Sequence, residues 1–275
     1  MSGFLDDMAR SSSARAARAQ GIESSQNLER RARQAPSPPP LRLSPAGFDV
    51  IAELKLRSPA LGALGSAAQP WASRVAAYAR AGAAAVSVLT EPTRFDGSLE
   101  HLCEAARALA PYGVPAMRKD FIVDPYQVLE ARAAGAGGVL IIVRMLSRAQ
   151  FAELLETSLE HGLFVLVEAF DEADLELAAE FLAPRHRAGE PILVGVNCRD
   201  LQTLQVVKSR FATLAPRLPP GWPAVAESGV ATAPDALAVK RLGYRLALIG
   251  TALMAQGEPG ALLREILDTT RTPPA

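Results

Sequence analysis

The feature that most constrains the fold is a repeat of eight short apolar runs, separated by loops and by amphipathic stretches rich in alanine and leucine. Short runs of β-branched and aliphatic residues are typical of buried strands, and the longer stretches between them are typical of helices. Such alternation predicts parallel strands joined by helices. The eight runs are residues 49–54, 85–90, 114–118, 138–143, 163–168, 192–197, 223–227 and 245–250.

Eight strand-helix units in a chain of 275 residues favour an α/β fold of one (β/α)8 barrel, which takes about 250 residues. The alternative is a doubly wound open sheet, which places its phosphate-binding glycines after the first strand. Here Gly229 and Gly250 follow the seventh and eighth runs, which favours the barrel. The clearest expected helices are residues 71–81, 99–110, 125–134, 147–161 and 259–267.

The first 41 residues differ in character from the rest of the chain. A proline-rich stretch at 35–40 cannot form a helix or a central strand, so it indicates a linker. Before it, a short helix is expected to carry Phe4, Leu5 and Met8 on one face. We therefore expect residues 1–41 to be a helical arm and linker, part of the same domain as a barrel over 42–275.

Charge and composition argue against several classes of partner. Lys+Arg 29 and Asp+Glu 29 give a net charge of +0, so nucleic acid is not an expected partner. No apolar run approaches the roughly 18 residues of a membrane helix. Cys103 and Cys198 are far apart and the histidines are scattered, so we expect neither disulfides nor a metal, and a cytoplasmic location fits best.

Charged residues stand where the expected strands end, which is where such barrels carry out chemistry. Only four lysines occur in the chain, and two of them, Lys55 and Lys119, lie at these ends. Glu53, Glu168 and Glu227 lie at corresponding positions. A single charge at a strand end has a structural explanation, but five together indicate an acid-base site, because paired ammonium and carboxylate groups shift each other's pKa.

Two glycine turns follow the last two strands. Backbone N–H groups at Ser228-Gly229 and Gly250-Thr251 can hold an anion, as phosphate sites of this fold do. Lys55 and Ser58, after the first strand, would complete the site. Each glycine alone is typical of an ordinary turn, whereas their occurrence after adjacent strands favours phosphate binding.

Ordered motifs stand at the ends of the expected strands along nearly the whole chain. The first strand ends in Glu53-Leu54-Lys55 before Ser58-Pro59, and the third ends in Arg118-Lys119-Asp120-Phe121. Later strands give Leu166-Val167-Glu168, Gly195-Val196-Asn197, Ala226-Glu227-Ser228-Gly229 and Ile249-Gly250. In this order the motifs closely resemble the indole-3-glycerol phosphate synthase family.

This resemblance implies a carboxy-lyase of tryptophan biosynthesis that needs no cofactor. Its small-molecule substrate would be a phosphosugar-anthranilate, 1-(2-carboxyphenylamino)-1-deoxyribulose 5-phosphate, and its product indole-3-glycerol phosphate. Lys119 matches the general acid, Glu168 its acid-base partner, and Lys55 a group near the substrate carboxylate. The resemblance further implies that Glu53, Asn197, Glu227 and Ser228 orient the substrate, and that Phe95, Phe121, Leu140 and Pro59 line its aromatic pocket.

Two alternatives share these residues. One is a diverged relative that acts on a substituted anthranilate-derived substrate, and the other is a barrel that binds the phosphosugar without catalysis. Retention of both lysines and all three glutamates argues against the second. Phosphoribosylanthranilate isomerase has the same fold, but a cysteine at the end of its first strand would be expected where Glu53 and Lys55 stand. The sequence leaves the oligomeric state open, with a monomer as one expectation.

Overall fold

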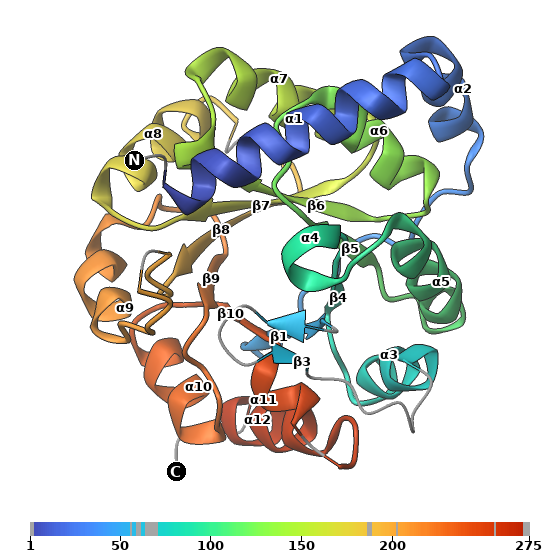
Figure 1. The fold of residues 1–275 in the computed structure, drawn as a ribbon. Coiled ribbons are helices and arrows are strands. Elements are labelled where there is room, and N and C mark those ends of the chain that lie inside the picture. Colours follow the sequence, from blue (N-terminus) through green and yellow to red (C-terminus); the bar gives the residue numbers. More distant parts are fainter. Residues whose placement is uncertain are drawn as a thin grey trace.

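Eight parallel strands close into a barrel in the computed structural model, which describes residues 3–55, 57–58, 62–63, 71–185, 189–201, 203–255 and 257–271 (Figure 1). The order around the ring is β1-β10-β9-β8-β7-β6-β5-β4, and β1 pairs with both β10 and β4. The strands are β1 (Asp49–Leu54), β4 (Ala85–Leu89), β5 (Ala116–Lys119), β6 (Gly138–Ile142), β7 (Phe164–Ala169), β8 (Ile192–Asn197), β9 (Ala224–Glu227) and β10 (Leu246–Ile249).

Helices surround this barrel, as the alternating pattern predicts (Figure 1). The longer ones are α3 (Trp71–Arg80), α5 (Leu99–Leu109), α6 (Pro125–Ala133), α7 (Arg148–Glu160), α8 (Glu172–Leu182), α9 (Ser209–Leu214), α10 (Ala233–Arg241) and α12 (Ala261–Arg271). Shorter elements are β2 (Arg57–Ser58), β3 (Gly62–Ala63), α4 (Pro92–Phe95), α11 (Thr251–Met254) and the single turns Ala110–Tyr112, Val143–Met145 and Ala215–Arg217. The predicted strands and helices are confirmed, with small differences at their ends.

Two apolar clusters account for the barrel's layered structure. The larger lies between strands and helices, and it includes Val50, Val139 and Val194 on the outward faces of their strands. The other fills the barrel interior, with Ile51, Met117, Leu140, Leu166 and Leu193 among its members. Because side chains alternate along a strand, the inward positions that follow these residues point into the mouth. Glu53, Lys119, Glu168 and Asn197 are at those positions.

The N-terminal arm forms two helices, α1 (Phe4–Ile22) and α2 (Ser25–Gln34), of which the sequence predicted only a short first one. Helix α2 packs on α6, where Leu28 and Ala32 are fully buried. Helix α1 crosses the face of the molecule on the side of β6 and β7, and its Met8 is buried with the barrel interior (Figure 1). The arm therefore lies beside the barrel mouth.

Within the described part of the chain, no helix is both long and apolar enough to cross a membrane.

Candidate active site

A cavity of about 520 Å³ opens at the carboxyl ends of the barrel strands. It is lined by residues that the sequence assigned to catalysis, to the aromatic pocket and to phosphate binding. These are Glu53, Lys55, Lys119, Glu168, Asn197, Glu227 and Ser228, then Phe95, Phe121 and Leu140, then Gly229, Gly250 and Thr251. Pro59 lies outside the described residues, and only the backbone of Ser58 is described, in β2.

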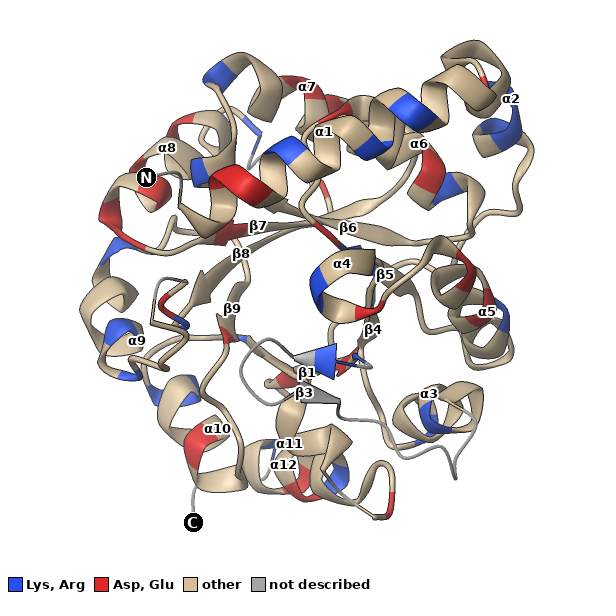
Figure 2. Ribbon diagram, viewed as in Figure 1, with Lys and Arg blue, Asp and Glu red and all other residues tan. Residues whose placement is uncertain are grey.

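Lys119, at the end of β5, lies between two carboxyl groups. Its Nζ is 3.1 Å from Glu168 Oε2 at the end of β7 and 3.5 Å from Glu227 Oε2 at the end of β9. The side chains of both glutamates are almost completely buried, whereas that of Lys119 is 16% exposed. Three strands that are distant in sequence thus bring one proton donor and two acceptors together. Figure 2 shows charged residues on the barrel strands as well as on the surrounding helices.

The carboxyl groups determine the direction of the pKa shifts in this cluster. Burial alone would lower the pKa of Lys119, but the charges of Glu168, Glu227 and Glu53 outweigh it and raise that pKa. Burial and the neighbouring Glu168 carboxylate raise the pKa of Glu227 well above its usual range. The sequence predicted that these groups shift each other's pKa without giving the direction. The direction is upward for Lys119 because the cluster contains more carboxyl groups than ammonium groups.

A second ion pair lies on the first strand. Lys55 Nζ is 2.7 Å from Glu53 Oε1, and both side chains are largely buried. Burial raises the pKa of Glu53, but Lys55 and Lys119 reverse this effect, so the net shift is downward. Glu53 therefore carries a negative charge at neutral pH, in contrast to the raised pKa of Glu227.

The glycine turns lie across the ring from the aromatic wall. In the eight-stranded ring, β9 is four strands away from β5, and β10 is four strands away from β6. Ser228 and Gly229 both have left-handed backbone, with φ of 58° and 128°. A left-handed conformation at a non-glycine residue such as Ser228 is uncommon and is found preferentially at functional sites. This turn exposes backbone at the rim, and Gly229, Gly250 and Thr251 line the cavity there.

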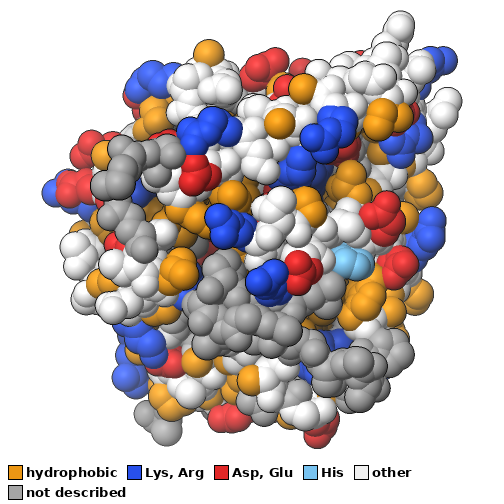
Figure 3. Space-filling model, viewed as in Figure 1, with side chains coloured by type: hydrophobic (Ala, Val, Ile, Leu, Met, Phe, Trp, Pro, Cys, Tyr) orange, Lys and Arg blue, Asp and Glu red, His pale blue; other side chains and the backbone are white. Residues whose placement is uncertain are grey.

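Aromatic rings form the opposite wall, and one of them comes from the arm. The ring of Phe121 is 6.3 Å from that of Phe95 and 5.8 Å from that of Phe4, measured between centroids. Phe4 and Leu5 line the cavity together with these rings. Hydrophobic side chains are visible between α1 and the centre of the ring (Figure 3). The sequence predicted the apolar face of the arm but contained no signal for its partner, because the contact joins segments more than 100 residues apart.

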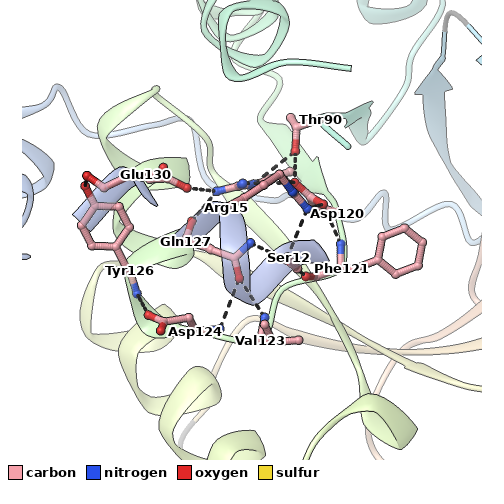
Figure 4. Close-up of polar contacts among 12 residues, drawn as sticks. Ser12, Arg15, Thr90, Asp120, Phe121, Val123, Asp124, Tyr126, Gln127 and Glu130 are labelled. Carbon is pink, nitrogen blue, oxygen red and sulfur yellow. Dashed lines mark hydrogen bonds and ion pairs between the residues drawn. The ribbon is translucent and has the colours of Figure 1, made fainter. Parts of the chain in front are cut away.

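A buried polar network, which sequence reasoning missed, holds the segment after Lys119 (Figure 4). Asp120 is 3% exposed and accepts hydrogen bonds from Arg15 at 2.7 and 3.0 Å, from Thr90 at 2.8 Å and from Arg118 at 3.1 Å. Ser12 of α1 donates to the carbonyl oxygen of Phe121. Helix α1 therefore fixes the backbone on which Lys119 and Phe121 stand.

Two other expectations concern metals and thiols. Among the described residues, no group of three or more His, Cys, Asp or Glu side chains is arranged to hold a metal ion. Cys198 is fully buried, and burial raises the pKa of its thiol to about 12. Its thiol therefore stays protonated at neutral pH and is a poor nucleophile.

Acid-base groups at the carboxyl ends of the strands place the chain among the (β/α)8-barrel enzymes that act on small molecules. Within that class it belongs to the indole-3-glycerol phosphate synthase family, because the model of that family matches residues 6–266. This is a family of lyases in tryptophan biosynthesis.

Individual relatives agree with this membership. The chain is 45% identical to an indole-3-glycerol phosphate synthase from Parafrankia sp. (strain EAN1pec), over 82% of this chain and 80% of that protein. It is 39% identical to an indole-3-glycerol phosphate synthase from Mycolicibacterium smegmatis, over 96% of this chain and 93% of that protein. Among solved structures, 3-hexulose-6-phosphate synthase from Salmonella typhimurium aligns with a TM-score of 0.59 at 13% identity, covering 81% of this chain and 98% of that one. At that identity the likeness shows the fold alone.

Proposed function

We propose that this chain converts 1-(2-carboxyphenylamino)-1-deoxyribulose 5-phosphate to indole-3-glycerol phosphate, releasing carbon dioxide and water. The observation that carries this proposal is the position of Lys119 between Glu168 and Glu227, in a cavity that also has an aromatic wall. Family membership supports the same reaction.

Ring closure requires a proton donor at the ribulose carbonyl. The raised pKa of Lys119 keeps its ammonium charged at neutral pH, so it can supply that proton as the aromatic carbon bearing the carboxylate attacks the carbonyl carbon. Loss of carbon dioxide then restores the aromatic ring. The new hydroxyl takes up a second proton and leaves as water, and the adjacent CH2 carbon loses a proton, which forms the double bond of the five-membered ring. Glu168, 3.1 Å from Lys119, is positioned to act as that base.

The rest of the cavity suits the two ends of such a substrate. Phe95, Phe121 and Leu140 would contact the anthranilate ring and exclude water, which strengthens the charge interactions at the reacting atoms. Across the ring, Gly229, Gly250 and Thr251 with Lys55 would hold the phosphate. A volume of about 520 Å³ is in the range of sites for ligands of this size.

The direct test is to mix the purified chain with the synthetic substrate and to follow the indole chromophore. We expect indole fluorescence to appear with release of carbon dioxide. Binding of the substrate without indole formation would instead support a non-catalytic phosphosugar-binding barrel. A parallel assay with ring-substituted substrates distinguishes the diverged relative, for which turnover of a substituted substrate would exceed that of the plain one.

Two finer expectations belong to this proposal. The presence of two free thiols, Cys103 and Cys198, supports a reducing, cytoplasmic setting. The expected oligomeric state is a monomer of 29.1 kDa, and light scattering of the purified chain would distinguish it from a larger assembly.

A further inference from the structure

Two glycines face into the barrel where carboxyl groups lie against them. Gly195 is in β8, in register with Glu168 on β7, and Gly250 directly follows β10. A Cβ atom at Gly195 would lie only 2.1 Å from Oε1 of Glu227, and a Cβ at Gly250 would lie 2.2 Å from Oε1 of Glu53. Each of these glutamates thus rests over a glycine of the strand beside its own.

The requirement for glycine at position 195 is one of space rather than of backbone conformation. Gly195 does not have the positive φ that favours glycine, so alanine can adopt its backbone. The neighbouring inward positions of β8, Leu193 and Asn197, carry full side chains. Glycine inside a strand weakens it, and it often marks a point of close approach by another group. Here the approaching group is the Glu227 carboxyl.

We propose that Gly195 is a positioning residue that fixes the Glu227 carboxyl beside Lys119. Glu227 is 1% exposed, and within the described residues no hydrogen-bond donor has good geometry to either of its carboxyl oxygens, although the Glu168 carboxyl lies beside it. Its ion pair with Lys119, at 3.5 Å, is longer than a hydrogen bond. Lys119 and Glu168 are therefore its only close polar neighbours among the described residues, and the carboxyl takes the position that the missing Cβ leaves open over β8. The inference rests on the proposed function, in which Glu227 lies beside Lys119 and orients the substrate.

Gly250 is a weaker case of the same arrangement. Lys55 holds the Glu53 carboxyl at 2.7 Å, so Glu53 has a second restraint that Glu227 lacks. Gly250 also belongs to the proposed phosphate site, so its substitution would alter both phosphate binding and the position of the Glu53 carboxyl. Gly195 is therefore the position at which the inference can be tested cleanly.

Gly195→Ala is expected to displace the carboxyl rather than to unfold the protein. The atom in closest conflict with the new Cβ is the end of a flexible side chain, which can turn into the open cavity. The other neighbour, Leu166 Cδ1 at 3.1 Å, needs to move by only a few tenths of an ångström. Relieving a 2.1 Å contact moves the carboxyl oxygen by about 1 Å, and an error of that size at a reacting group can cost about 100-fold in rate.

A double-mutant cycle tests this directly, with kcat and KM measured for wild type, Gly195→Ala, Glu227→Ala and the double variant. We expect Gly195→Ala to lower kcat/KM by about 10- to 100-fold in the wild-type background. In the Glu227→Ala background it should have almost no effect, because no carboxyl remains to be displaced. Single-turnover measurements with excess enzyme extend the cycle if steady-state rates become too low.

The possible outcomes separate the inference from the function on which it rests. Equal losses from Gly195→Ala in the two backgrounds would overturn the positioning role. Normal turnover in Glu227→Ala would instead overturn the proposed role of Glu227. An impaired Glu227→Ala variant beside an unimpaired Gly195→Ala variant would overturn the inference alone.

Gly138→Ala is a matched control, because Gly138 is also a strand glycine that lacks space for a Cβ. There the new atom would meet the buried ring of Phe164, with contacts of 2.4 to 2.5 Å, and this ring is packed inside the barrel and cannot turn away. We expect a lower Tm with unchanged turnover per folded molecule. Gly195→Ala should show the reverse, a nearly unchanged Tm with reduced turnover. If Gly195→Ala behaves like the control, the positioning role is wrong.

Discussion

Lys119 has three carboxyl groups around its ammonium, which has a direct chemical consequence. Glu168 and Glu227 both lie within 3.5 Å of it, and Glu53 also contributes to its raised pKa. A lysine held in its charged form is ready to donate a proton. Glu168 beside it stabilises the positive charge in the resting enzyme and can receive a proton later in the reaction.

Lys119→Met should therefore abolish most turnover while the barrel stays folded. Methionine keeps an unbranched side chain of similar length, and Glu168 and Glu227 can share a proton once the ammonium is gone. We expect kcat to fall on the order of 100-fold or more. Steady-state kinetics measure the loss of turnover, and circular dichroism tests whether the barrel stays folded. Lys240→Met is the control, because Lys240 donates to a backbone carbonyl on α12 and should change stability rather than turnover. Near-normal turnover in Lys119→Met would remove this residue from the role of general acid.

Asp120 should make the stability of the folded chain depend on pH in the acid range. Burial opposes its charge, but Arg118 and Arg15 outweigh burial and lower its pKa from 3.8 to about 2. A carboxyl with a lowered pKa in the folded state stabilises the fold above its unfolded pKa, and this contribution is lost as pH falls from about 4 to about 2. The shift corresponds to about 2 kcal/mol.

Urea unfolding of wild type and Asp120→Asn between pH 7 and pH 2.5 would measure this contribution. The difference in free energy of unfolding should be constant near neutrality and should narrow below about pH 4. A difference that stays constant across the whole range would contradict the assignment.

Helix α1 is attached to the barrel partly through charge. Arg15 reaches from this helix to the fully buried side chain of Asp120 after β5, whereas Arg10, on the same helix, pairs with Asp7 in solvent. Removing one member of a buried pair leaves the other charge without its partner. An exposed pair contributes little, because water and salt screen it.

These two arginines offer a matched comparison. Arg15→Met should lower the free energy of unfolding by about 2 to 3 kcal/mol, less than for a completely isolated charge because Arg118 still contacts Asp120. Arg10→Met should stay within about 0.5 kcal/mol of wild type. Chemical denaturation of both variants under one condition gives the comparison. Equal effects would mean that the Arg15–Asp120 pair does not anchor the arm.

The elements that the sequence predicted well are those determined by local pattern. Strand and helix periodicity located the eight strands, and their ends located Lys119, Glu168 and Glu227. The position of α1 was not predictable, because it depends on contacts such as Ser12 to Phe121, 109 residues apart. The direction of the pKa shift of Lys119 was not predictable either, because it depends on the distances between its ammonium and the surrounding carboxyl groups. Gly195 did carry a signal, since a glycine within the apolar run 192–197 is unusual in a buried strand.

At the scale of the whole molecule, the ring separates two kinds of surface within one cavity. Aromatic side chains of the arm, of α4 and of the segment after β5 lie on one side, and the glycine turns after β9 and β10 lie on the other. The charged cluster lies between them, at the inward ends of the strands. A substrate with an aromatic ring at one end and a phosphate at the other would therefore be held at both ends, with its reacting carbons near Lys119.

If Gly229, Gly250 and Thr251 bind the phosphate, binding energy from this remote group also positions the reacting carbons. Substrate without its phosphate should then lose turnover as well as affinity. Inorganic sulfate should compete with the substrate, more weakly because it does not contact the aromatic wall. Thr251→Ala should weaken sulfate inhibition modestly by removing one hydroxyl donor, whereas Thr213→Ala, on the exposed face of α9, should not. Steady-state kinetics measure the turnover of the dephosphorylated substrate, and inhibition kinetics measure competition by sulfate in wild type and in both threonine variants. Equal processing of the dephosphorylated substrate, with no competition by sulfate, would show that the phosphate does not bind at the ends of β9 and β10.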